Sequence, residues 1–442
     1  MNCRLVRLSL MNFLSFDNLV FDLRKKNGES QNCALIYGEN GSGKTNLIQA
    51  MSFLAESTRT LADSKREHGR DVQAIRDEIA QMLSNYNYET KRTPLDIEEL
   101  ASEYRMIGSE DVMAVRYEFL LNGESVEYTL VFTPDGKLKE EKLDSVINIR
   151  RGNIFEISTV DTKMRPGLFS KTYSREIQAL IGKYWGRHTL LSIMNHEFKE
   201  KSEDYVRDNI FGKFKDILEA IQSMEIVRSN GVTRIADMYL SFPRGVIESK
   251  NADRLKVAEE VLSRFFTRLY SRVRDVYIRT EEIGEGRIAY ELFFKKEISG
   301  TIRDIPGSKE SAGTKNLMIL LPYFLHCADG GMLFVDDLDV CIHDILVKSL
   351  LEDSLPEIPG QLVATTHDTL LMDETRADSV FIIRIDMEGY KEIRSVASIE
   401  KPHKGTNVQR RYAAGCYRGI PFTGDLGLDG ILRCQKGMVQ HD

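Results

Sequence analysis

The sequence predicts an α/β fold with a largely parallel sheet whose strands come from both ends of the chain, and three observations predict it. Short apolar runs with the composition of buried strands occur at 33–37, 332–335, 361–365 and 380–385. Helical periodicity follows the first run and separates the later ones, at 314–328 and 344–355. A long stretch without an internal repeat lies between the two groups. We therefore expect one α/β core interrupted by an insertion.

Antiparallel strands are expected beside this core. Apolar residues over 5–13 give the chain a β-like opening. Over 112–132 the side chains alternate in the way of a half-buried strand pair, and Asn122–Gly123 is a favoured two-residue hairpin turn. These patterns predict an antiparallel β lobe.

Two stretches differ from the core in their pattern. Residues 60–110 hold charged, amphipathic helical segments, and residues 172–280 have mainly helical periodicity. The charged segments fit either a solvated hairpin that packs on the core or an arm that docks a partner protein. The sequence leaves both interpretations open.

The composition excludes several classes of protein. The 442 residues are 42% hydrophobic and 29% charged, which is enough for a folded core. The 60 Lys and Arg against 67 Asp and Glu give a net charge of −7, which disfavours a general polyanion binder. The six cysteines form no CxxC pair and no metal-ligand spacing, and no apolar run reaches the roughly 18 residues of a membrane span. We expect a cytoplasmic protein that has no membrane partner.

The clearest motif is GxxxxGK[ST] at 38–45, between a predicted buried strand and a predicted helix. In this context a glycine-rich backbone wraps the phosphates of a nucleotide, and the helix N-terminus adds a favourable dipole. Lys44 reaches the β- and γ-phosphates, and the hydroxyl of Thr45 can bind Mg²⁺. The predicted nucleotide-binding residues are Gly38, Glu39, Asn40, Gly41, Ser42, Gly43, Lys44, Thr45 and Asn46.

Two adjacent carboxylates follow the buried run 332–335. Ligands of α/β proteins bind at the carboxyl ends of the strands, so Asp336 suits a Mg²⁺ ligand, usually acting through water. Asp337 then occupies the place of a general base or a carboxylate that orients water. Taken alone, the pair also fits an acidic strand-to-loop turn, but its occurrence together with the glycine-rich motif favours a catalytic site.

Two weaker signals complete the set. Ser311 and Gly313 precede an apolar helix, where the pattern fits an ordinary helix cap as well as an anion-binding N-terminus. His367 follows the buried run 361–365, where a histidine is either structural or contacts a γ-phosphate or a water.

The order of these motifs resembles that of ABC-type ATPases of the SMC/RecF kind. Lys44 and Ser311 are 311 − 44 = 267 residues apart, whereas Ser311, Asp336 and His367 fall within 56 residues. That family has a Walker A motif, a long insertion, a signature motif, Walker B and a switch histidine, and residues 8–16 resemble its first strand. The resemblance implies an ABC-type ATPase head, which is a P-loop NTPase fold with a mixed sheet, an antiparallel β lobe and a helical insertion.

The resemblance also implies a division of the chain into five parts. They are the N-terminal part of the head with Walker A (1–58), a charged helical hairpin (59–111), the β lobe (112–160), a helical insertion lobe (161–284), and the C-terminal part of the head with signature, Walker B and switch histidine (285–442).

Particular residues gain roles from the same resemblance. Two such heads meet head to tail on ATP and Mg²⁺, so that the signature residues Ser311 and Gly313 of one copy close on the nucleotide of the other. His367 becomes the switch histidine, and 338–343 becomes the loop that crosses between heads. The usual catalytic glutamate is Asp337 here, shorter by roughly 1.5 Å, so we expect slow ATP hydrolysis or a long-lived ATP-bound state.

More narrowly, the chain resembles stand-alone bacterial AAA/ABC-like ATPases of abortive-infection and related anti-phage systems, such as PARIS, Septu and some retrons. The matching stretches are 36–53, 117–143, 311–321, 333–343, 361–373 and 412–422. The resemblance implies a sensor or scaffold that assembles as a dimer or higher oligomer and controls a toxic effector protein, expected to be a nuclease. A phage protein or DNA would be the trigger. The sequence contains no second catalytic constellation, which favours a separate effector.

Two other functions stay open. A RecF-like DNA-repair clamp would act directly on DNA, but the basic clusters at 150–151, 401–404 and 410–411 are short and lack interleaved aromatic residues. A nucleotide-gated assembly module would bind ATP without hydrolysing it. ATPase activity that DNA stimulates would favour the clamp, whereas co-purification with a toxic protein encoded nearby would favour the anti-phage function. Release of phosphate from ATP would distinguish an ATPase from the non-hydrolysing module.

Overall fold

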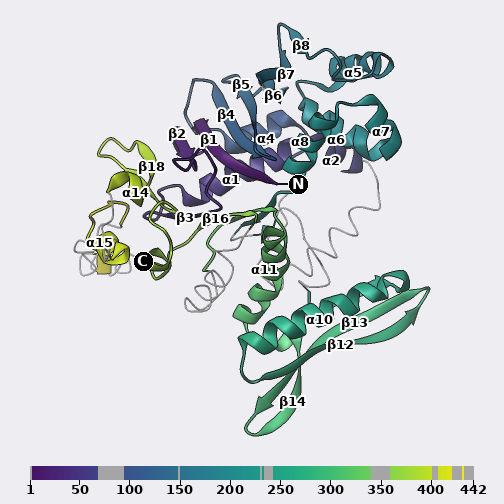
Figure 1. The fold of residues 1–442 in the computed structure, drawn as a ribbon, viewed down its shortest axis with the longest axis vertical. Coiled ribbons are helices and arrows are strands. Elements are labelled where there is room, and N and C mark those ends of the chain that lie inside the picture. Colours follow the sequence, from purple (N-terminus) through teal and green to yellow (C-terminus); the bar gives the residue numbers. More distant parts are fainter. Residues whose placement is uncertain are drawn as a thin grey trace, which may run out of the picture.

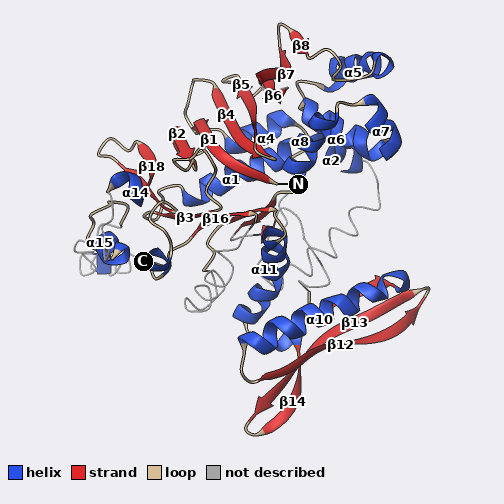
Figure 2. Cartoon of the chain, viewed as in Figure 1, coloured by secondary structure: helices blue, strands red, loops and turns tan. Residues whose placement is uncertain are grey.

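The computed structural model describes residues 2–67, 94–147, 150–228, 231–232, 242–339, 359–400, 407–420 and 431–432. Within these ranges, two seven-stranded sheets and one four-stranded sheet form the framework. Figures 1 and 2 show the two larger sheets close together, with the smaller sheet and α10 (Ala252–Leu269) extending away from them at the end of α11 (Ala312–Ala328). None of the helices in the described part of the chain is long and apolar enough to span a membrane.

The core sheet has the strand order β10-β9-β15-β16-β3-β17-β18. Its parallel strands are β9 (Glu225–Arg228), β15 (Met332–Val335), β16 (Gln361–Thr365), β3 (Cys33–Tyr37) and β17 (Val380–Ile385). Antiparallel edge strands are added by β10 (Gly231–Val232) and β18 (Lys391–Ser395). Every residue of β3, β15 and β16 is buried, as expected for parallel strands that are covered on both faces. The four apolar runs predicted as strands are confirmed.

The second large sheet is antiparallel and forms the predicted β lobe. Its order is β2-β1-β4-β5-β6-β7-β8. The strands are β1 (Cys3–Phe13), β2 (Phe16–Asp22), β4 (Met113–Leu121), β5 (Glu124–Phe132), β6 (Leu138–Ile147), β7 (Arg150–Ser158) and β8 (Thr162–Met164). Asn122 and Gly123 have φ angles of 50° and 84°, as the predicted hairpin turn requires. The predicted fold class, a mixed α/β head with an antiparallel β lobe, is therefore confirmed.

Helix α1 (Lys44–Ser57) lies between the two large sheets. It contacts β9, β15 and β16 of the core sheet, and its Ala50 carbonyl accepts a hydrogen bond of 2.6 Å from the Tyr117 hydroxyl of β4. Leu47, Ile48, Met51, Phe53 and Leu54 are all buried, because both sides of the helix are covered. The start of α1, at Lys44, is thereby fixed relative to both sheets.

The remaining helices mostly follow the core strands or build the insertions. They are α2 (Thr60–Glu67), α4 (Ile97–Tyr104), α5 (Lys171–Tyr184), α6 (Leu190–Glu200), α7 (Glu203–Asn209), α8 (Gly212–Gln222), α13 (Leu371–Glu374), α14 (Val396–Ile399) and α15 (Val408–Ala413), with 3₁₀ turns η1 (Ser249–Asn251) and η2 (Gly307–Lys309). The predicted helix over 314–328 is confirmed as α11. The predicted helix over 344–355 and the middle of the predicted hairpin, 68–93, lie outside the described residues.

The prediction of mainly helical structure over 172–280 is right for α5 to α8 and α10 but misses several strands. The missed strands are β9 and β10 of the core sheet, and β11 (Arg244–Glu248) and most of β12 (Val273–Gly284) of the small sheet. The small sheet is completed beyond residue 280 by β13 (Arg287–Ile298) and β14 (Thr301–Pro306). Most of the second half of β12 is exposed, so the strand lacks the apolar pattern that marks a strand in a sequence. The predicted boundary at 284–285 falls in the turn between β12 and β13. We call residues 242–306 the extension lobe.

A buried carboxylate joins the β lobe to the helices of the insertion. Glu141 on β6 is fully buried, and its oxygens accept hydrogen bonds from the Tyr128 hydroxyl (2.9 Å), the Trp185 indole (2.9 Å) and the amide of Leu190 (2.6 Å), which begins α6. Burial raises the pKa of Glu141 from 4.5 to about 7, although these donors oppose the change.

The pH dependence of folding stability tests this arrangement. The folded-state pKa of Glu141 lies above its unfolded value, so the protonated side chain stabilises the folded protein. This stabilisation is fully present below the unfolded pKa of 4.5 and is lost as the pH rises to about 7. Between about pH 5 and about pH 8, we expect wild-type protein to lose about 2 kcal/mol of unfolding free energy relative to Glu141→Gln, which does not titrate.

Denaturant unfolding at both pH values measures this difference. Lys139→Gln, on the same strand but exposed, is the control and should track the wild type at both pH values. A Glu141→Gln variant whose unfolding free energy shifts in parallel with wild type would show that Glu141 does not titrate in this range.

Candidate functional site

The loop from Gly38 to Gly43 turns sharply between β3 and α1. Gly41 and Gly43 have φ angles of 82° and 105°, in the left-handed region that favours glycine. A Cβ atom on Gly43 would also lie 2.8 Å from the Phe16 ring. Glycine is therefore required at position 43 by both backbone conformation and space, and α1 begins at Lys44 with its first amides facing the loop.

Lys44 folds back over this loop. Its Nζ donates hydrogen bonds to the carbonyl oxygens of Gly38 (2.8 Å) and Glu39 (3.2 Å), and the residue is only 6% exposed. Burial lowers the pKa of Lys44, while the carboxylates of Asp337 and Asp336 act in the opposite direction. The ammonium is thus desolvated and lies near acidic groups.

The loop also contains a buried hydroxyl without a partner. The Ser42 side chain is fully buried, and its Oγ makes no hydrogen bond within the described part of the chain. A buried hydroxyl of this kind costs free energy unless a ligand pairs with it. Together with Lys44 and the glycine backbone, Ser42 fits a loop that accepts an anionic group such as a phosphate.

The two predicted carboxylates lie at the end of β15, and Thr365 at the end of β16 holds them. The Thr365 hydroxyl donates to Asp336 Oδ1 at 2.7 Å and accepts from the amide of Asp337 at 2.8 Å. Asp336 is 2% exposed, whereas Asp337 is more open and has a φ of 54°. Burial, followed by repulsion from Asp336, raises the pKa of Asp337. Sequence reasoning did not identify Thr365, which is one of many β-branched residues in strands.

His367 follows on the loop after β16. Its Nε2 lies 3.9 Å from Asp337 Oδ1, and about half of its side chain is exposed. Asp339 holds the start of this loop, because its Oδ1 accepts hydrogen bonds from the Thr366 hydroxyl (2.5 Å) and from the amide of His367 (3.1 Å). Asp339 was also missed, although the run Asp336–Asp337–Leu338–Asp339 placed a third carboxylate nearby.

The sheet order explains why these residues meet. β15, β16 and β3 are consecutive parallel strands, so their carboxyl ends lie at one edge of the sheet. That edge carries Asp336 and Asp337 after β15, His367 after β16, and the glycine loop with Lys44 after β3. Thr45 and Asn46 are half-buried in the first turn of α1. Thr45 and Asp336 supply oxygen ligands of the kind that Mg²⁺ takes beside a nucleotide.

Ser311 and Gly313 lie elsewhere. Ser311 is the N-cap of α11, and its exposed Oγ accepts a hydrogen bond from the amide of Thr314 at 3.2 Å. The adjacent Glu310 pairs with Lys296 of β13 in the extension lobe, at 2.6 Å. The C-terminal end of α11 leads into the start of β15, so the N-terminus of α11 lies one helix length, about 25 Å, from the start of that strand. Within the described residues, no hydrogen bond joins Ser311 or Gly313 to the loop at 38–45.

Part of the predicted crossing loop is described. Leu338 and Asp339 are placed, and the amide of Leu338 donates to the Thr365 carbonyl at 2.9 Å. Residues 340–343 of that prediction lie outside the described residues.

The C-terminal segment 407–420 packs against the start of the glycine loop. A Cβ atom on Gly419 would lie 2.9 Å from the Ile383 carbonyl and 3.7 Å from the Cα of Gly38. The Tyr412 hydroxyl donates to the Gly419 carbonyl at 2.8 Å, which closes the segment on itself. Of the stretch 412–422 singled out in the sequence, the described part, 412–420, therefore lies against the site.

Comparisons with known proteins give a family but no curated relative. A family model described as AAA domain matches residues 7–229, which is 229 − 7 + 1 = 223 residues and just over half of the chain. None of the curated proteins matches.

Similar solved structures include two SMC head domains and a recombination mediator protein. The Smc head domain of Pyrococcus furiosus, bound to the C-terminal domain of ScpA, is 15% identical, with a TM-score of 0.38 over 89% of this chain and 96% of that chain. The SMC head domain of Thermotoga maritima is 16% identical, with a TM-score of 0.36 over 89% and 98%. The recombination mediator protein RecF with ATPrS is 13% identical, with a TM-score of 0.37 over 89% and 98%.

The family match covers β3, the glycine loop and α1, the elements that build the phosphate-accepting loop around Lys44. The chain therefore belongs to the AAA domain family of P-loop ATPases.

Proposed function

We propose that this chain is a slow, Mg²⁺-dependent ATPase whose ATP-bound copies pair head to tail and control a separate effector protein. One observation carries the pairing. The loop at 38–45, Asp336, Asp337 and His367 share one sheet edge, whereas Ser311, which is exposed, and Gly313, which is half-buried, lie at the N-terminal end of α11. A second copy would bring an exposed helix N-terminus and a hydroxyl to the open side of the nucleotide.

Different residues at the sheet edge would bind the phosphates, hold the metal ion and activate the attacking water. Lys44 and the loop amides bind the β- and γ-phosphates, and Thr45 with Asp336 holds Mg²⁺, which neutralises the phosphate charge. Asp337 orients or deprotonates the attacking water, and His367, 3.9 Å from Asp337, faces the same space. Ser311 and Gly313 contact the γ-phosphate from the second copy.

Control of an effector is supported by the sequence resemblance to ATPases of anti-phage systems. The resemblance includes 412–422, whose described part packs on the first glycine of the loop. A long-lived ATP-bound pair, caused by the short Asp337 side chain, would suit a sensor or scaffold that holds a nuclease in check until a trigger arrives.

The head-to-tail arrangement predicts complementation between two inactive variants. Lys44→Met removes phosphate binding from one copy, and Ser311→Arg blocks the signature of the other, so neither variant alone should assemble with ATP. A mixture can form one intact site from Lys44 of one chain and Ser311 of the other. We expect ATP-dependent assembly to reappear in the mixture, measured by light scattering after chromatography.

Ser299→Arg is the control for this experiment, because Ser299 is an exposed serine in the β13–β14 turn of the extension lobe. It should assemble like wild type. Failure of the mixture to assemble, with wild type assembling normally, would mean that the nucleotide site is not shared between copies.

The length of the Asp337 side chain predicts a gain of activity. If the short side chain limits hydrolysis, Asp337→Glu should raise the single-turnover rate by about 10- to 100-fold, and Asp337→Asn should nearly abolish hydrolysis while ATP binding remains. A wild-type rate that already exceeds that of Asp337→Glu would contradict the proposed cause of slow turnover.

The pH profile of the same rate gives a second readout. The pKa of Asp337 is raised by burial and by Asp336, and a general base acts in its ionised form. Hydrolysis should therefore fall as the pH drops through a value above the ordinary 3.8 of an aspartate, and Asp337→Asn should lose this acid limb.

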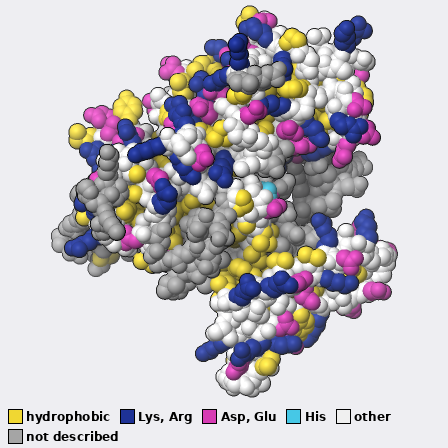
Figure 3. Space-filling model, in the orientation of Figure 1, with side chains coloured by type: hydrophobic (Ala, Val, Ile, Leu, Met, Phe, Trp, Pro, Cys, Tyr) yellow, Lys and Arg dark blue, Asp and Glu magenta, His cyan; other side chains and the backbone are white. Residues whose placement is uncertain are grey.

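A clamp that acts directly on DNA is the second candidate. Of the predicted basic clusters, Arg151 pairs with Glu127 (2.8 Å) and Arg411 with Glu400 (2.8 Å), while 401–404 lies outside the described residues. On the face shown in Figure 3, Lys and Arg side chains are interspersed with acidic ones. These pairings favour the sensor, and a salt-dependent stimulation of hydrolysis by duplex DNA would favour the clamp.

A further inference from the structure

Lys391 is a second lysine at the glycine loop. It comes from β18, which lies on the side of β3 opposite to β15 and β16. It is the first residue of β18 and stands opposite Ile385, the last residue of β17. An antiparallel strand begins where its parallel neighbour ends, so Lys391 lies at the same sheet edge as the loop at 38–45.

The ammonium group of Lys391 bridges the glycine loop and the β1–β2 turn. Its Nζ donates to the carbonyl of Gly41 at 3.1 Å and to the Ser15 hydroxyl at 2.9 Å, and it lies 5.6 Å from the centre of the Phe16 ring. The Ser15 hydroxyl also accepts from the Asn46 side-chain amide at 2.7 Å. Lys391, Ser15 and Asn46 therefore form one cluster at the first turn of α1.

The two lysines differ in the charges around them. Asp337, Asp336, Asp339 and Glu39 all stabilise the charge of Lys44, whereas among the described residues Glu39 alone does so for Lys391. The neighbouring Glu392 instead pairs with Arg384 and Arg394, each at 3.1 Å. Burial lowers the pKa of Lys391, and the more distant Glu39 opposes this. A half-buried ammonium held only by neutral oxygens is stabilised when an anion arrives.

The strand order indicates which part of a nucleotide would reach this lysine. β15 and β16, which carry Asp337 and His367, lie on one side of β3, and β17 and β18 lie on the other. The γ-phosphate belongs on the side of Asp337, where water attacks. The opposite end of the phosphate chain then points toward Lys391.

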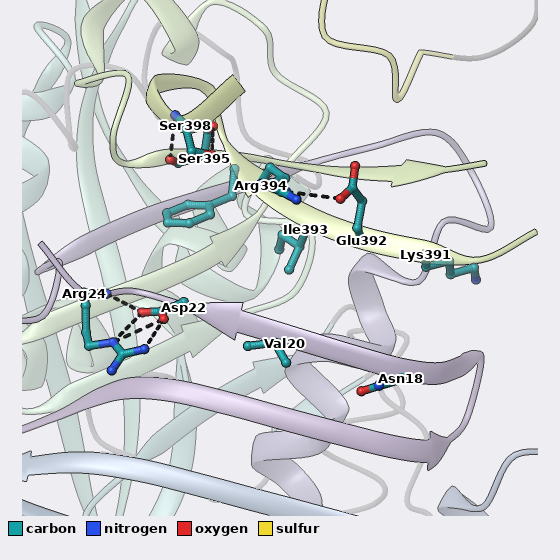
Figure 4. A pocket seen from close by; sticks show the side chains of 11 residues that line it. Asn18, Val20, Asp22, Arg24, Lys391, Glu392, Ile393, Arg394, Ser395 and Ser398 are labelled. Carbon is teal, nitrogen blue, oxygen red and sulfur yellow. Dashed lines mark hydrogen bonds and ion pairs between the residues drawn. The ribbon is translucent and has the colours of Figure 1, made fainter. Parts of the chain in front are cut away.

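The ammonium is also accessible from outside. Lys391 lines a groove of about 520 Å³ between β2 and β18, together with Asn18 and Val20. In Figure 4, Lys391 lies at one end of this groove, away from the Arg394–Glu392 pair. Lys391 is therefore not enclosed by protein on the side of this groove.

We propose that Lys391 binds the α-phosphate of the nucleotide held at Lys44. Its ammonium exchanges the Gly41 carbonyl for a phosphate oxygen, which is the stronger acceptor because it is charged. This inference rests on the proposed binding of ATP at the loop, and it adds a binding residue contributed by the last strand of the core sheet.

Affinities for ATP and ADP test the inference, because both nucleotides carry the α-phosphate. Lys391→Met should weaken the binding of Mg·ATP and of ADP by a similar factor of about ten, measured by isothermal titration calorimetry. Lys391→Gln, which keeps a hydrogen-bond donor but not the charge, should show the same loss. Lys391→Arg should restore most of the affinity.

Arg394→Met is the matched control, because it removes a positive charge from the same strand at a residue that pairs with Glu392. It should bind both nucleotides like wild type. Unchanged affinities in Lys391→Met and Lys391→Gln would overturn the inference, and so would a loss confined to ATP, which would place the contact at the γ-phosphate. A wild-type protein that binds neither nucleotide would instead refute the proposed function itself.

Discussion

Parallel pairing of β15, β16 and β3 sets where the glycine loop, the Asp336–Asp337 pair and His367 lie, because each of them follows one of these strands. Hydrogen bonds in register, Val335 opposite Ala364 and Thr365 opposite Ile36, align the three strands so that each ends at the same edge. The strands come from distant parts of the chain, so closing the sheet costs loop entropy on the order of (3/2)RT ln n. Complete burial of these strands offsets that cost and makes their relative position rigid.

Charge is distributed unevenly along that edge, so one end of the site is acidic and the other end is basic. Three aspartates gather on the side of β15, where Thr365 and the loop backbone hold them and where Lys44 partly balances them. Lys391, on the side of β18, is held by neutral oxygens. An elongated anion with a metal at one end matches such a gradient, because Mg²⁺ satisfies the acidic side while phosphate oxygens satisfy the lysines.

Helix α11 joins the extension lobe to the core sheet. α11 is anchored at its C-terminal end by β15, and Glu310 and Lys296 tie the residues before it to β13. A rigid helix of about 25 Å between the two anchors keeps Ser311 at a fixed distance from the loop of its own chain.

Local elements and the residues of recognisable motifs can be predicted from the sequence alone. Buried strands, the glycine loop and the hairpin at Asn122–Gly123 are encoded in short windows, because strong apolar runs and glycines at positive φ have few alternatives. Only the tertiary structure decided which strands are neighbours. That order brought together Thr365, Asp339 and Lys391; Thr365 and Lys391 are ordinary residues in their own segments, and Asp339 is marked only by the neighbouring Asp336 and Asp337. The tertiary structure also revealed the pairing of β12 with β13. Many residues of β12 are exposed, so its sequence lacks the apolar pattern of a strand, and its hydrogen bonds depend on a partner strand.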